Sequence, residues 1–160
     1  MANLYGKART KKEILEKVGD ISQICEAKSV RFSGGNREGV EAVSVRTGSG
    51  LNFNVIPGRG MDIGLVEYKG YNFCWRSSTG EVHPSYFEPE GSGMDRNYHG
   101  GLMHISGLTY SGLPCTDNGK NLGLHGRASN IPAQNVYSDG QWEGDDYSVW
   151  VQGKYVRLQV

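Results

Sequence analysis

The segment LGLHGRASNIPA, residues 122–133, carries two side chains suited to holding a polar ligand. His125 and Arg127 lie two residues apart, with Gly126 between them. On an extended backbone, alternate side chains point to the same face, so we expect the two to face the same way. An imidazole makes one hydrogen bond per nitrogen, and a guanidinium fork binds paired oxygens. The pair therefore predicts a surface for vicinal hydroxyls or a sugar acid; the alternative is a turn that happens to carry two basic residues.

A second candidate is the segment IPGRGMDIG, residues 56–64, which places Arg59 close to Asp62. A Gly-Arg-Gly turn allows the backbone to approach a ligand closely. The phosphate-binding patterns GxGxxG and GxxxxGK are absent from this segment, so it is not read as a nucleotide loop. Either Arg59 and Asp62 contact a ligand, or they pair with each other inside a tight turn.

Two histidines and a tryptophan complete the set of candidates. His99 and His104 are five residues apart, a spacing that suits neither a strand nor a helix, so the metal signal is weak and we expect no metal ion. His104 either faces a ligand or is a core histidine. Trp75 either stacks on the apolar face of a sugar or belongs to the core.

The composition excludes several classes of function. Lys and Arg number 17, as do Asp and Glu, which argues against a nucleic-acid partner. No apolar run is long enough for a membrane span, and the N-terminus lacks a signal peptide, so we expect a cytoplasmic protein. Three widely spaced cysteines suggest neither a zinc site nor a disulfide scaffold. No cofactor motif is present, and none is expected.

The pattern of elements that would position these residues is that of an all-β chain. A short helix is expected near residues 11–18, with Thr10 as its N-cap. Short apolar runs separated by 24 dispersed glycines then recur about every ten residues, which favours an antiparallel sandwich or barrel. The cleanest strand is LNFNVIP, a hairpin is expected at Lys69–Gly70, and further strands are expected around residues 147–152 and 155–160. We divide the chain into a helical segment, 1–19, and a β-domain, 20–160.

Three segments in this order, VIPGRGMDIG, GGLMHISGLTYSGLP and LGLHGRASNIPA, resemble aldose 1-epimerase-like proteins, and in particular a bacterial branch classified as a domain of unknown function. The resemblance spans about residues 20–157. It implies the β-sandwich of galactose mutarotase, usually about twice as long, so the chain resembles the first half and its β-domain is expected to be incomplete at the C-terminus.

The resemblance also implies a set of site residues. His125 matches the histidine that classical mutarotases place against the sugar near its ring oxygen, and is the catalytic candidate. The candidate sugar-binding residues are Arg127, Arg59, Asp62, His104 and Trp75. The general base glutamate and the acid histidine of the classical enzymes come from their later half and have no identified counterpart here.

The function expected on this basis is carbohydrate binding with acid–base sugar epimerisation in the full-length form. The alternatives are a carbohydrate-binding module without catalysis, and an inactive truncated fragment. The expected partner is a small-molecule carbohydrate. Self-association, or a partner chain that completes the sheet, is a further expectation.

Overall fold

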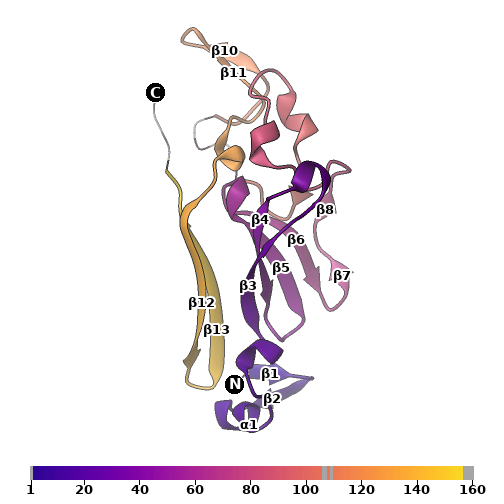
Figure 1. Cartoon of the computed structure of the whole chain (residues 1–160), viewed down its shortest axis with the longest axis vertical. Helices are drawn as coiled ribbons and strands as arrows, with labels where there is room; N and C mark the ends of the chain where they lie inside the picture. The colour runs from indigo at the N-terminus through magenta and orange to yellow at the C-terminus, as the bar shows by residue number, and fades with distance from the viewer. Residues whose placement is uncertain (1, 106–107, 109, 157–160) are drawn as a thin grey trace.

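The computed structural model describes residues 2–105, 108 and 110–156 and is an antiparallel β-sandwich (Figure 1). Its main layer is a five-stranded sheet in the order β3-β4-β5-β6-β7, in which each strand pairs with the next along the chain. The strands of this sheet are β3 (Glu26–Arg31), β4 (Glu41–Arg46), β5 (Leu51–Ile56), β6 (Asp62–Tyr68) and β7 (Tyr71–Asn72).

The second layer is a long hairpin of β12 (Gln134–Glu143) and β13 (Asp146–Lys154), which runs along one face of the main sheet (Figure 1). The core between the layers is aliphatic: Val149 and Val151 of the hairpin pack against a buried cluster that includes Val43 and Val55. Burial of such side chains stabilises the sandwich by roughly 1.5–3 kcal/mol each.

Shorter elements lie at the two ends of the sandwich. The small strand pairs are β1 (Ala2–Leu4) with β2 (Lys7–Arg9), β8 (Trp75–Arg76) with β9 (Gly100–Gly101), and β10 (Cys115–Asp117) with β11 (Lys120–Leu122). The helix is α1 (Lys11–Leu15), and short 3-10 turns are η1 (Ile21–Gln23), η2 (Gly35–Arg37), η3 (Pro57–Arg59), η4 (Pro84–Tyr86), η5 (Gly93–Arg96) and η6 (Ala128–Asn130). Nowhere in the described part of the chain is there a helix with the length and hydropathy of a membrane span.

Several sequence predictions are confirmed by these elements. The all-β antiparallel fold, the strand at LNFNVIP and the N-cap at Thr10 are all observed. Thr10 and Glu13 form a reciprocal capping box, although the helix ends at Leu15 rather than near residue 18. The turn at Lys69–Gly70 joins β6 to β7, with φ of 50° and 83° at its two central residues, as a tight hairpin requires.

The prediction for the end of the chain is partly wrong. Tyr155 and Val156 belong to no strand, and residues 157–160 lie outside the described residues. The strand expected around residues 147–152 lies within β13. Strand β12 was missed altogether: it carries Ser138, Asp139 and Gln141, and its polar sequence gives a weak apolar alternation. It forms because its other face packs on the main sheet, where the Ser138 hydroxyl also donates to the Ala27 carbonyl.

Candidate functional site

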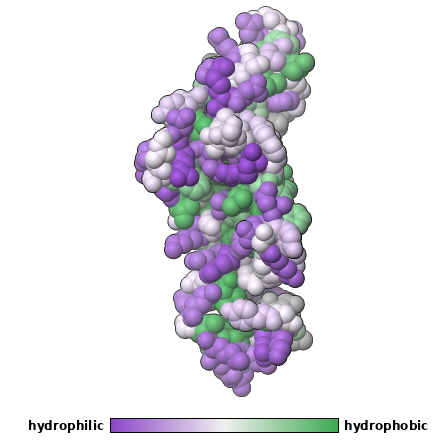
Figure 2. All heavy atoms as spheres, turned by 90° about the vertical axis from the view of Figure 1, so that its right-hand side faces the viewer, coloured by the Kyte–Doolittle hydropathy of each residue, from purple (hydrophilic) through white to green (hydrophobic). Residues whose placement is uncertain are grey.

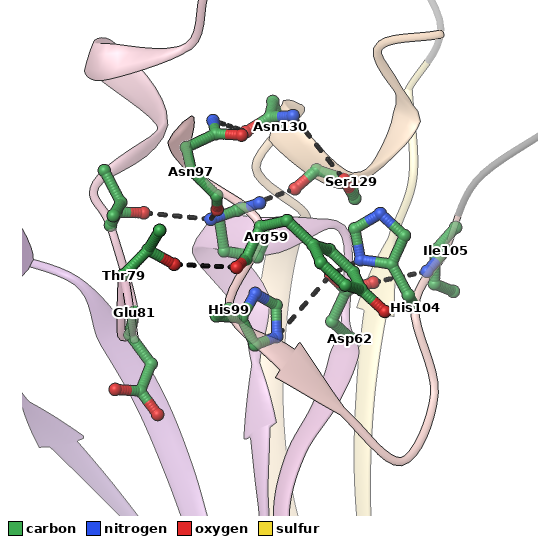
Figure 3. A network of polar contacts seen from close by, with 12 residues as sticks. Arg59, Asp62, Thr79, Glu81, Asn97, His99, His104, Ile105, Ser129 and Asn130 are labelled. Carbon is green, nitrogen blue, oxygen red and sulfur yellow. Dashed lines mark hydrogen bonds and ion pairs between the residues drawn. The ribbon is translucent and has the colours of Figure 1, made fainter. Parts of the chain in front are cut away.

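Arg59 is the centre of a buried polar network at the end of the main sheet where β5 meets β6 (Figure 3). It ends the turn η3 and its side chain is completely buried. Its Nε donates to the carbonyl of Ser129 at 2.8 Å, and its Nη1 donates to those of Val82 at 3.0 Å and Asn97 at 2.9 Å. A single guanidinium therefore holds together three segments that are far apart in the sequence.

Asp62 is the first residue of β6, and its carboxylate is also completely buried. Its Oδ1 accepts a hydrogen bond from the backbone N–H of Ile105 at 2.5 Å. Its Oδ2 lies 2.9 Å from Nδ1 of His104 and 3.9 Å from Nε2 of His99. Both imidazoles turn toward the carboxylate in Figure 3. We call the following set the polar cluster: Arg59, Asp62, Asn97, His99 and His104.

Two glycines bring the histidines of the polar cluster to one side of the chain. Gly100 and Gly101 have φ of 79° and 106°, so the chain bends sharply between His99 and His104. The bend packs closely on β6: a Cβ on Gly101 would be only 2.6 Å from the carbonyl oxygen of Ile63. A spacing of five residues, as between His99 and His104, argues against a shared face only on a regular helix or strand, and this segment is neither.

The electrostatics of the cluster keep one imidazole neutral. The pKa of His99 is lowered to about 4, mainly by burial and then by the charge on Arg59, although Asp62 opposes both. Burial also lowers the pKa of Arg59 from its usual value, again against the effect of Asp62. At neutral pH, His99 is therefore uncharged and its approach to Asp62 is not an ion pair.

An aromatic stack leads from the polar cluster to the surface. Trp75 stacks on Tyr98 with ring centroids 6.0 Å apart, and the edge of Tyr98 meets His104 at 5.0 Å. Trp75 is 64% exposed, so the interpretation of this residue as part of the core is wrong. Its stacking on a sugar stays a prediction. Figure 2, which views the molecule from the side of β7 and β8, shows hydrophobic surface across the middle of this face.

The structure does not give His125 and Arg127 the shared strand face that the sequence predicted. Strand β11 ends at Leu122, and His125 lies in a turn with φ of 54°. The imidazole Nδ1 of His125 accepts from the backbone N–H of Gly112, whereas Arg127 is exposed. No hydrogen bond or ion pair between described residues joins either side chain to the polar cluster. Their roles toward a ligand stay predictions.

The sequence therefore identified Arg59, Asp62 and His104 as candidates, and the structure brings all three together. It did not identify Asn97, whose Nδ2 donates to Oδ1 of Asn130 at 2.8 Å, and it gave His99 little weight. The signal for Arg59 and Asp62 was their closeness in the Gly-Arg-Gly-Met-Asp segment, directly after a clear strand. No local pattern could have matched that segment with residues about 40 positions later.

The fold and site together define an antiparallel β-sandwich protein with a buried Asp–His–His group under an exposed aromatic stack. Residues 37–160 match the model of the family described as a domain of unknown function, DUF4432, and the chain belongs to this family.

A crystal structure described as that of "a putative aldose 1-epimerase from Klebsiella pneumoniae subsp. pneumoniae MGH 78578" is similar to the chain, with 26% sequence identity and a TM-score of 0.70. The match covers 79% of this chain and 34% of the other, so the chain spans about a third of the length of that structure. No curated protein matched the sequence. The resemblance to an aldose 1-epimerase-like fold is thus confirmed.

Proposed function

We propose that this chain binds carbohydrate as part of an aldose 1-epimerase-like protein. The observation that carries the proposal is the exposed face of Trp75, supported from behind by Tyr98, directly beside His104. Aromatic faces stack on the C–H faces of sugar rings, and neighbouring polar groups bind the hydroxyls. The similarity to the Klebsiella structure supports the same class of ligand.

The finer part of the proposal is acid–base epimerisation in the full-length form. In mutarotation a base removes the proton of the C1 hydroxyl while an acid protonates the ring oxygen, and the ring opens and recloses as the other anomer. Each positioned group typically contributes about 10²–10⁴-fold to the rate. We assign His125 to the sugar side of this chemistry and propose that a carboxylate and a second histidine outside residues 1–160 complete the set.

The binding role does not depend on the catalytic one. The chain covers about a third of the similar crystal structure. A carbohydrate-binding module without catalysis therefore stays the second candidate. Measuring binding and turnover separately distinguishes the two.

Binding is tested by isothermal titration of the protein with a panel of aldoses, starting with glucose and galactose. Trp75→Ala is expected to weaken binding roughly tenfold, which corresponds to about 1.4 kcal/mol of lost stacking. Tyr137→Ala is the matched control, because Tyr137 is also an exposed aromatic residue, 48% exposed, on the remote hairpin. Equal affinities of Trp75→Ala and wild type would refute the assignment, as would the absence of binding to any aldose tested.

A further inference from the structure

We propose that Asp62, His99 and His104 form a binding site for a divalent transition-metal ion of the Zn²⁺ class. Each residue offers one ligand atom, and the three ligand atoms all lie within 4.8 Å of one another. Asp62 begins β6 and the histidines flank β9, and the residues that follow β9, Leu102 and Met103, hydrogen-bond to Ile63 of β6. This inference concerns a metal site and does not rest on the proposed sugar binding.

The spacing of the ligand atoms is close to what an ion requires. Zinc binds imidazole nitrogen and carboxylate oxygen at about 2.0–2.2 Å with tetrahedral geometry, so two ligand atoms of one ion lie roughly 3.3–3.6 Å apart. The distances from Asp62 Oδ2 to His104 Nδ1, 2.9 Å, and to His99 Nε2, 3.9 Å, lie on either side of this range. The ligand nitrogens of His99 and His104 lie within 4.8 Å of each other, so binding of an ion requires rotation of these side chains to bring the nitrogens closer together.

The ligand atoms are buried and lack hydrogen bonds among the described residues. Asp62 Oδ2 and both ring nitrogens of His99 and of His104 have no hydrogen-bond partner there, and each of these atoms is shielded from solvent. Although His104 Nδ1 lies 2.9 Å from Asp62 Oδ2, no aligned N–H joins them. Buried polar atoms in native proteins are nearly always satisfied, so a cluster of this kind calls for an occupant that accepts several lone pairs at once.

The donor atoms of the cluster are of the kinds that bind a metal ion. Asp62 is a buried carboxylate, and the Arg59 hydrogen bonds go instead to the carbonyls of three other residues. A neutral imidazole is the form that binds a metal. Two nitrogens and one carboxylate oxygen favour zinc or cobalt over calcium or magnesium, which prefer oxygen ligands.

The proposal is tested on the full chain after dialysis against a chelator. Titration with ZnCl₂ is expected to show one high-affinity ion per chain, and Co²⁺ is expected to give visible absorption bands of a site with nitrogen ligands. Both Asp62→Asn and His104→Gln are expected to weaken Zn²⁺ binding by about 100-fold. The matched control is His83→Gln, because His83 caps η4 through Ser85 and lies outside the cluster.

A measurement on the wild type alone guards against variants that fail to fold. A hundredfold excess of Zn²⁺ over its dissociation constant is expected to raise Tm by at least about 5 °C. Wild-type protein that binds no Zn²⁺ or Co²⁺ would overturn the proposal, and so would folded Asp62→Asn and His104→Gln variants that bind as tightly as His83→Gln. Trp75→Ala is expected to keep the metal affinity, so failure of sugar binding and failure of metal binding are distinguishable.

Discussion

Replacing Arg59 by methionine is expected to destabilise the chain by about 3–5 kcal/mol. Methionine fills similar space but removes every donor that the guanidinium supplies. The carbonyls of Ser129, Val82 and Asn97 would then lose their partners inside the protein. The perturbation therefore separates the three segments that Arg59 holds together.

The magnitude follows from the contacts. A hydrogen bond from a charged donor contributes roughly 1.5–3 kcal/mol, so three contribute roughly 5–9 kcal/mol. This loss is partly offset, because methionine avoids the free-energy cost of desolvating a buried guanidinium, which is on the order of several kcal/mol. The net loss is a large part of the 5–15 kcal/mol typical of a whole domain. Lysine at position 59 keeps the charge but lacks the fork, and we expect an intermediate loss.

Urea unfolding followed by tryptophan fluorescence and far-UV circular dichroism measures these free energies. The control is Arg96→Met, because Arg96 is exposed and pairs only with Glu88 at the surface among the described residues. It is expected to leave the unfolding midpoint unchanged. An Arg59→Met variant within about 1 kcal/mol of wild type would refute the reasoning, because the three hydrogen bonds would then contribute no net stability.

Three further predictions concern turnover, thiol access and the glycine bend. The chain alone is expected not to accelerate mutarotation of glucose or galactose in polarimetry, because no base and acid of the classical kind were identified in it; an acceleration abolished by His125→Ala would contradict this. In the native protein, the exposed Cys115 is expected to react quickly with a disulfide reagent, whereas the buried Cys25 and Cys74 react slowly. Burial also raises the pKa of Cys25, which slows its reaction further. Equal rates for all three thiols would contradict this. Gly101→Ala is expected to lower the free energy of unfolding by at least about 1–3 kcal/mol, since its φ of 106° and its contact with β6 exclude a Cβ; unchanged urea unfolding would contradict this.

The regular parts of the fold could be predicted because local rules apply to them. Leu51, Phe53 and Val55 alternate as a strand must, and Thr10 has the side chain that caps a helix. Of the two strands of the hairpin, only β13 was predicted. Strand β12 was missed because packing on β3, rather than its own polar sequence, stabilises it. A short stretch of sequence does not reveal such tertiary packing.

The candidate site could be predicted only residue by residue. The spacing of His99 and His104 was judged against an ideal helix and an ideal strand, but two glycines with positive φ lie between them. The same rule failed for His125, which lies in a left-handed turn instead of on an extended strand. Both errors have one cause: the residues near the site lie on irregular backbone, where side-chain direction does not follow from sequence spacing.

The arrangement around Arg59 links the two candidate regions. The Ser129 carbonyl that accepts from Arg59 lies two residues after Arg127, within the segment LGLHGRASNIPA. The Asn97 carbonyl that accepts from the same guanidinium lies two residues before His99. Because a buried guanidinium fork fixes the directions of its partners, these two segments are held in one relative position. We therefore expect Arg59 to act as a positioning residue for both, although it is too deeply buried to contact a ligand itself.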